Sequence, residues 1–205
     1  MTLRISIHPD NPQARLIAQA VAILDRGGLI AYPTDSGYAF GWRIASQSAQ
    51  ERVARIRGLD SRHNFTLVCR HLSEIGAYAR MHDAAFRLIR SLTPGPYTFL
   101  LPAAAALPRH LKQTKKRSVG VRIPDHRVAL ALVEALGEPL SSSSLILPGT
   151  DMAGWEVDDL YEHAGHGVDL FIDSGFCGNE PTTVIDLVED APKLVRQGKG
   201  EVPFA

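Results

Sequence analysis

The sequence predicts an α/β protein of one domain, built on a sheet that is at least partly parallel. Segments that alternate apolar and polar residues are interleaved with segments of helical periodicity along the whole chain. The opening order of strand, helix and strand is typical of a βαβ unit, which places its two strands parallel. No linker divides the 205 residues into halves, so we expect a single domain over 1–205.

The first unit follows local sequence signals. Residues 3–7 alternate as a strand. Residues 10–13 (DNPQ) predict a helix start capped by Asp10, with Gln13 as its box partner. The apolar side chains of this helix share one face up to Leu24, and Gly27 and Gly28 end it. A short buried strand follows over 29–32.

The rest of the chain continues the α/β pattern, and the helix near 83 is expected to be capped by Asp83. The predicted helices lie near 46–57, 83–92, 127–136 and 156–164. The predicted strands lie near 65–69, 97–101, 118–122, 140–145, 168–172, 182–187 and 193–196.

Composition excludes several classes of protein. With 45% hydrophobic and 21% charged residues, the chain is neither disordered nor fibrous. No apolar run approaches the roughly 20 residues that a bilayer span needs, and charges interrupt the first twenty positions, so we expect a cytoplasmic protein without a membrane partner. Cys69 and Cys177 lie far apart and lack metal-site spacing, so we interpret them as small buried hydrophobes, with no metal site.

Charge is distributed unevenly along a chain whose net charge is zero. Residues 151–190 hold eleven acidic side chains and no Lys or Arg, whereas 1–150 hold 19 basic against 10 acidic residues. The densest basic stretch runs from 107 to 127. The basic part is therefore the candidate for binding an anion, such as a polyphosphate or a nucleic acid, although a solvated loop would explain the run equally well.

Two segments near the N-terminus carry candidate chemistry. Residues 32–38 (YPTDSGY) bring hydroxyls, a carboxylate and two phenols to one strand end, where open α/β sheets place ligands; a plain turn would use the same residues. Arg55 and Arg57 stand near a helix end and could bind phosphate bidentately. They could also merely complement the helix dipole. Both reach one ligand only if the helix ends there.

Two later segments add hydroxyls and a further cation. Residues 119–124 (VGVRIP) alternate as a strand that would hold Arg122 at a sheet end. Four consecutive serines, 141–144, lead into an apolar run and would present alternate hydroxyls on one face; a polar edge strand is the other interpretation. The common phosphate loops GxxxxGKS/T and GxGxxG are absent.

Taken in order, these segments resemble the YrdC/YciO family, whose best-known members are threonylcarbamoyl-AMP synthases acting in tRNA modification. Each match alone is weak, but six in register are specific, and they run through nearly the whole chain. The segments are 32–38 (family YPT(E/D)TxYGLG), 55–57 (KxR), 93–98 (PGPxT), 119–124 (VGxRxP), 144–149 (SxNxSG), and 181–186 with 195–198 ((S/T)TV(V/I)D and VRxG).

The resemblance implies a twisted, mixed sheet of the YrdC/RibB-like kind, with flanking helices and a basic concave face. It implies ATP with magnesium, L-threonine and bicarbonate as ligands, and tRNA or double-stranded RNA as a partner. In the family's reaction a threonine carbamate attacks the α-phosphate and releases pyrophosphate. By position, the roles would be Thr34, Ser36, Tyr38, Arg57 and Thr183 for substrate, Ser142, Ser144, Arg122 and Arg196 for nucleotide, and Arg55, Arg57 and Ser144 for catalysis.

Two departures from the family pattern bear on activity. Arg55 replaces a lysine, and Ile146 replaces the asparagine of SxN, which removes an amide able to donate and accept. Both changes point to the YciO-like branch. A catalytically weak nucleotide- or RNA-binding module is therefore the alternative to a synthase, and a carbamoyl-adenylate chemistry on another substrate is a third. All three hypotheses require that positions 34, 57, 122 and 144 converge on one cavity.

Overall fold

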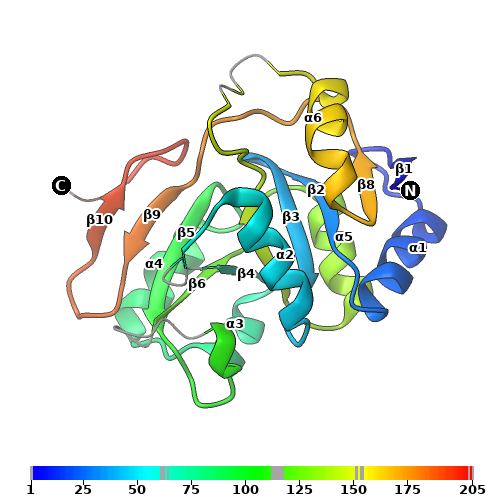
Figure 1. The fold of residues 1–205 in the computed structure, drawn as a ribbon. Coiled ribbons are helices and arrows are strands. Elements are labelled where there is room, and N and C mark those ends of the chain that lie inside the picture. Colours follow the sequence, from blue (N-terminus) through cyan, green and yellow to red (C-terminus); the bar gives the residue numbers. More distant parts are fainter. Residues whose placement is uncertain are drawn as a thin grey trace.

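The computed structural model describes residues 2–204 apart from 61, 62, 64, 112–117, 151, 153, 154 and 203. These residues form one ten-stranded mixed sheet with helices on both sides (Figure 1). The strands are β1 (Leu3–Ser6), β2 (Ile30–Thr34), β3 (Gly37–Arg43), β4 (Thr66–Val68), β5 (Tyr97–Pro102), β6 (Ser118–Arg122), β7 (Leu140–Ser144), β8 (Leu170–Asp173), β9 (Thr183–Asp186) and β10 (Lys193–Arg196). The helices are α1 (Ala14–Asp25), α2 (Gln47–Arg57), α3 (Leu72–Tyr78), α4 (Asp83–Leu92), α5 (Arg127–Leu136) and α6 (Val157–Ala164).

The strand order is β1-β8-β2-β3-β7-β4-β6-β5-β9-β10. The pairs β1–β8, β2–β8, β4–β6 and β5–β9 are parallel, and the others are antiparallel. The predicted mixed α/β sheet is therefore confirmed. The serine strand β7 lies between β3 and β4 in the middle of the sheet, so the interpretation of a polar edge strand is wrong.

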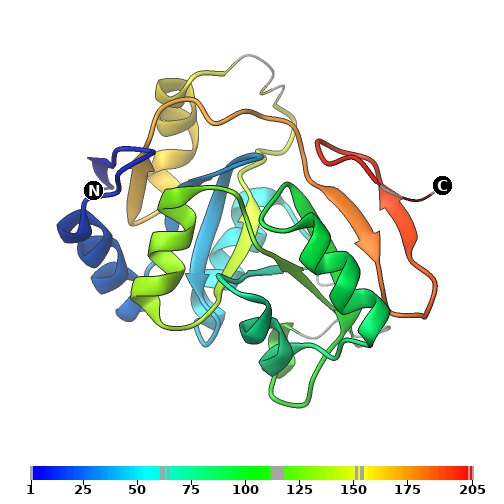
Figure 2. The ribbon, with the colours of Figure 1, turned by 180° about the vertical axis from the view of Figure 1, so that it is seen from behind.

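Three apolar clusters hold the helices to the sheet. Helices α1 and α5 pack against one another and against β2 through one cluster, which includes Leu24, Tyr32 and Leu132. Helix α4 packs against β5 and β6 in a second cluster, around Phe99. Helices α2 and α6 cover β2 and β3 in the third, around Trp42. Figure 1 shows α2 and α6 in front of the central strands, and Figure 2 shows α1, α4 and α5 from behind.

The structure corrects several local expectations. Helix α1 begins at Ala14, so Asp10 does not cap it; Gln13 is the N-cap residue, and its side chain accepts a hydrogen bond from the His8 amide at 3.1 Å. Helix α4 is capped by the ring of His82 and not by Asp83, which is its first helical residue. Strand β3 and helix α3 have no counterpart among the predicted elements. Within the described ranges, no helix is long and apolar enough to cross a bilayer.

Candidate functional site

A cavity of about 270 Å³ lies over the half of the sheet that runs from β7 to β10. We call it the polar cleft. Three neighbouring strands form the floor of the cleft. Thr66 of β4 pairs with Ser142 of β7 on one side and with Gly120 of β6 on the other, so these three residues lie side by side. The polar residues that line it are Arg57, His63, Thr66, Thr98, Arg122, Ser142, Ser143, Ser144, Thr182 and Arg196.

Arg57 is the last residue of α2 and enters the cleft because the helix ends there. Gly58 follows in the left-handed conformation, at φ 61°, which favours glycine. The half-buried guanidinium of Arg57 donates a hydrogen bond to Ser143 Oγ, and its Nη1 lies 3.3 Å from His63 Nε2. Arg55 is exposed and is not among the residues that line this cavity. The helix end therefore brings one arginine of the pair to the cleft.

Arg57 has no carboxylate partner in the part of the chain that the structure describes. Among the described residues it takes part in no ion pair, and its buried Nε has no hydrogen-bond partner. Burial lowers the pKa of Arg57. The pKa of His63 is also lowered, mainly by burial and to a smaller extent by the positive charge of Arg57. A neutral His63 can accept the hydrogen bond from Arg57. An unpaired, half-buried guanidinium is unfavourable unless an anion binds it, so this corner of the cleft fits a phosphate or a carboxylate.

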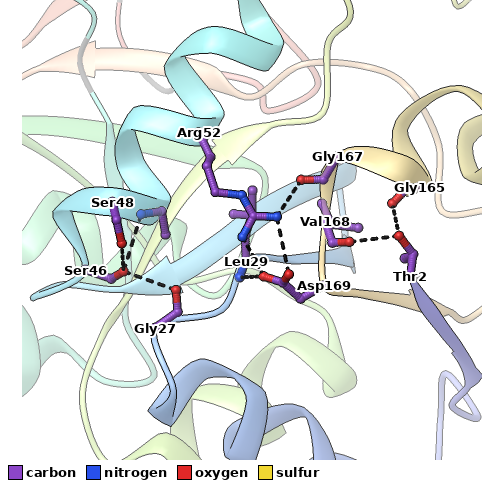
Figure 3. A network of polar contacts seen from close by, with 11 residues as sticks. Thr2, Gly27, Leu29, Ser46, Ser48, Arg52, Gly165, Gly167, Val168 and Asp169 are labelled. Atoms are coloured by element: carbon purple, nitrogen blue, oxygen red, sulfur yellow. Dashed lines mark hydrogen bonds and ion pairs between the residues drawn. The ribbon is translucent and has the colours of Figure 1, made fainter.

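Helix α2 is anchored so that its end stays in place (Figure 3). Arg52 donates to both carboxylate oxygens of Asp169, at 2.7 and 3.3 Å, and to the Gly167 carbonyl at 3.0 Å. Asp169 also accepts the Leu29 amide at 2.7 Å. Burial would raise the pKa of Asp169, but the hydrogen bonds from Arg52 and Leu29 outweigh it and hold that pKa below its usual value. At the N-terminus of α2, Ser46 caps the helix, and its hydroxyl donates to the Gly27 carbonyl.

The serine hydroxyls of β7 have different partners. Ser142 lies 2.8 Å from the buried Tyr32 hydroxyl and donates to the Phe40 carbonyl at 3.0 Å. Ser143 accepts from Arg57. Ser144 is the exposed member of the strand. Burial raises the pKa of Tyr32 to about 12, so its hydroxyl stays protonated. Ser144 is therefore the hydroxyl best placed to meet a ligand.

Arg122 lines the cleft but already has a partner. It forms an ion pair with Asp35, and the two side chains are only 8% and 10% exposed. Asp35 also accepts the Asp125 amide at 3.0 Å, and its backbone carbonyl accepts from Lys199 at 2.7 Å. The pair ties the turn between β2 and β3 to the end of β6, so Arg122 holds the floor of the cleft and neutralises Asp35 there.

Two predicted site residues are buried outside the cleft. Thr34 donates to the Gly37 carbonyl at 2.6 Å and holds the β2–β3 turn. Thr183 donates to the Gly200 carbonyl and accepts the Gly198 amide at 2.9 Å. Its neighbour Thr182 lines the cleft instead. Positions 57, 122 and 144 thus line one cavity, whereas the buried position 34 is not among the residues that line it. The expected convergence of all four positions therefore holds for three of them.

Arg196 also lines the cleft, at the end of β10. It donates to the Thr182 carbonyl at 3.1 and 2.8 Å and to the Thr182 hydroxyl at 3.2 Å. Part of the basic stretch 107–127, namely residues 112–117, lies outside the described residues, so the candidate nucleic-acid site there is not described as a whole. The arginines that line the polar cleft among the described residues are Arg57, Arg122 and Arg196.

A second cavity of about 250 Å³ adjoins the polar cleft, and Ser144 and Ile146 line both. We call it the apolar pocket. Ser36 and Tyr38 line it, as do Trp155 and Phe176. Cys177 also lines it and is half-buried and free, so the expectation that it is a buried small hydrophobe is met only in part, whereas Cys69 is buried in the core as expected.

Sequence reasoning missed several of these residues. His63 stands in a polar stretch six positions after Arg57, and its place beside that arginine follows only from the turn after α2. The walls of the apolar pocket come from three parts of the chain, 36–38, 144–146 with Val157 and Leu160 of α6, and 176–179. No local sequence pattern connects these parts.

Comparisons with known proteins agree with this fold. The chain is 51% identical over 199 residues to the uncharacterized protein YciO of Escherichia coli K12, covering 97% of each chain. The crystal structure of E. coli YciO superposes with a TM-score of 0.94, at 49% identity, over 99% of this chain and 98% of that one.

More distant relatives include a named enzyme and a structure with a bound amino acid. Threonylcarbamoyl-AMP synthase of Escherichia coli O1:K1 is 33% identical over 143 residues, 68% of this chain and 75% of that protein. P. abyssi Sua5, crystallised with L-threonine, superposes with a TM-score of 0.87 at 26% identity, over 96% of this chain and 58% of Sua5. Residues 22–198 match the Sua5/YciO/YrdC family model, described as "Telomere recombination". The chain therefore belongs to the Sua5/YciO/YrdC family.

Proposed function

We propose that this protein binds ATP and L-threonine in the polar cleft and catalyses nucleotidyl transfer of the threonylcarbamoyl-AMP synthase type. The observation that carries the proposal is the half-buried guanidinium of Arg57, which has no carboxylate partner among the described residues and lies in the same cavity as Ser143 and Ser144. The 33% identity to a threonylcarbamoyl-AMP synthase and the likeness to Sua5 with L-threonine support it.

The proposed reaction joins two anions. Bicarbonate and the amino group of threonine give a carbamate and water. A carboxylate oxygen of that carbamate attacks the α-phosphorus of ATP, and the bond from the α-phosphorus to the oxygen that bridges to the β-phosphate breaks to release pyrophosphate. Fixed cations and donors offset the repulsion, and one such preorganised donor is worth about 3 to 4 kcal/mol in the barrier. Arg57 and Ser144 are the groups placed to supply this stabilisation, and Arg196 adds a cation at the far end of the cleft.

Magnesium would enter this site with the nucleotide. Within the described part of the chain, no three His, Cys, Asp or Glu side chains are grouped to hold a metal ion. Mg²⁺ is commonly held by substrate phosphates, waters and few protein ligands, so a magnesium–ATP complex fits a cleft lined by cations and hydroxyls.

One experiment tests the proposal. The protein is incubated with ATP, magnesium, bicarbonate and L-threonine, and pyrophosphate release is measured with and without threonine. Threonine-dependent release is the expected result. No such release at high protein concentration would contradict the proposal.

The second candidate is a catalytically weak module that binds nucleotide or double-stranded RNA. Ile146 favours it, because an apolar side chain lies 49% exposed where the family pattern has an amide. RNA held by phosphate contacts would bind with an affinity that falls steeply with salt. Salt-dependent binding of tRNA or duplex RNA, together with absent pyrophosphate release, would favour this candidate.

A further inference from the structure

The proposed reaction needs a group that takes up a proton. The amino group of threonine is mostly an ammonium at neutral pH, and an ammonium has no lone pair with which to attack bicarbonate. Its conversion to a carbamate releases one proton for each molecule of threonine. A base within reach of the amino group would therefore speed this step.

One side chain of the polar cleft can act as such a base. Among the described residues that line the cleft, the polar ones are arginines, hydroxyls and the imidazole of His63, with no Asp, Glu, Lys, Cys or Tyr. Arginine stays protonated and only donates hydrogen bonds. Histidine changes its protonation between about pH 5 and about pH 8. Within the described lining, His63 is therefore the group that exchanges a proton near neutral pH.

Aromatic contacts tie the ring of His63 to the core. The imidazole packs edge-on against Phe65, with ring centroids 5.2 Å apart and an angle of 67° between the planes. Phe65 packs edge-on against Trp42 of β3 at 5.1 Å, and Trp42 is fully buried. The His63 amide donates to the Asp60 carbonyl at 3.2 Å, in the turn after α2. The ring is therefore held at the edge of the cleft.

Neighbouring charges keep His63 neutral in the free protein. Among the described residues, the charged groups that face the imidazole are Arg57 at the end of α2 and Asp60 in its own turn. The adjacent rings of Phe65 and Trp42 carry no charge. Burial and the charge of Arg57 outweigh the effect of Asp60, so the pKa of His63 lies below its ordinary value. Because a guanidinium only donates, the 3.3 Å contact with Arg57 Nη1 makes His63 Nε2 the acceptor and places the ring proton on Nδ1.

We propose that His63 is the general base that deprotonates the amino group of threonine. The inference rests on the proposed function and adds a catalytic residue to it. A phosphate of ATP bound by Arg57 competes with His63 for that guanidinium, which frees the lone pair of Nε2 for the substrate.

The proton then moves in a balanced sequence. Nε2 takes one proton from the ammonium, and the freed nitrogen forms a bond to the carbon of bicarbonate. The bond from that carbon to its hydroxyl breaks, and the hydroxide leaves with a second nitrogen proton as water. The imidazolium returns its proton to solvent, and the carbamate attacks the α-phosphorus as described above.

The dependence of the rate on pH distinguishes a base from a structural residue. Pyrophosphate release gives kcat/KM for threonine in the parent protein, His63→Gln and His71→Gln, from about pH 6 to about pH 9. Glutamine keeps a hydrogen-bonding group but takes up no proton. His71 precedes α3, is exposed and is not among the residues that line the polar cleft, so its variant is the matched control.

The expected effect of His63→Gln depends on pH. At about pH 7 this change should lower kcat/KM about 100-fold or more, and His71→Gln should leave it unchanged. Well below the pKa of the threonine amino group, the rate of His63→Gln should rise about tenfold per pH unit, in step with the fraction of free amine. The parent should vary little over the same range. Isothermal titration calorimetry should show that His63→Gln binds magnesium and a non-hydrolysable ATP analogue about as tightly as the parent.

The outcomes separate this inference from the proposed function. Threonine-dependent release that His63→Gln leaves unchanged, or lowers equally at every pH, would overturn the inference and leave the proposed function standing. A loss of nucleotide binding as large as the loss of rate would also overturn it, because His63 would then serve to hold the nucleotide. Absence of threonine-dependent release by the parent at every pH would overturn the proposed function, and the inference with it.

Discussion

Replacing Arg55 and Arg57 one at a time tests whether both arginines bind the nucleotide, as the family resemblance implies, or only the one that lines the polar cleft. The resemblance gives both arginines a role, whereas the structure brings only Arg57 into the polar cleft and leaves Arg55 exposed. Arg57→Ala removes a charge-assisted hydrogen bond to a phosphate, worth about 1.5 to 3 kcal/mol. This corresponds to roughly 10- to 150-fold weaker nucleotide binding. Arg55→Ala removes an exposed charge and should weaken binding less than about threefold.

Isothermal titration calorimetry with magnesium and a non-hydrolysable ATP analogue measures the two affinities. Circular dichroism on each variant checks that α2 remains folded. The reasoning is refuted if Arg57→Ala binds the analogue as tightly as the parent protein, or if Arg55→Ala weakens binding as much as Arg57→Ala does.

Three further changes test other features. Ile146→Asn restores an amide where the two cavities meet and should raise threonine-dependent pyrophosphate release about 10- to 100-fold; equal or lower turnover argues against that account. Arg52→Ala should lower the free energy of unfolding by about 1 kcal/mol. Because Asp169 has a lowered pKa in the fold, the difference in free energy of unfolding between the parent protein and the variant should be full at neutral pH and shrink below about pH 4. Urea unfolding at several pH values measures it, and a difference that stays constant down to low pH would contradict the prediction. Gly37→Ala puts a Cβ 2.9 Å from the Gly178 carbonyl at a φ of 111°, so the melting temperature should fall, and an unchanged value would contradict the strain.

Much of the fold was predictable because apolar residues recur about every two positions in a half-buried strand and about every 3.6 positions in a helix. Strand β3 was missed for a physical reason: buried from Gly37 to Trp42, it shows no alternation of apolar and polar residues. It merges with the turn chemistry of residues 32–38. Helix α3 has only seven residues and includes Gly76, which weakens the helical pattern.

The site was predictable in its residue types and less so in their roles. Sequence order identified Arg57, Arg122 and Ser144, which the cleft does bring together. It could not reveal that Arg122 is already paired with Asp35, or that the hydroxyl of Thr183 is used by the segment that follows β10. Those outcomes depend on contacts between positions 15 to 87 residues apart.

The central place of β7 also governs when the cleft can exist during synthesis. Until residues 140–144 have emerged and inserted, β3 and β4 have no strand between them. The hairpin of β2 and β3 then presents an unpaired edge, a feature that promotes misassociation of nascent chains. Pairings of such long sequence separation form slowly, so shielding of that edge by a chaperone would matter most before this late strand arrives.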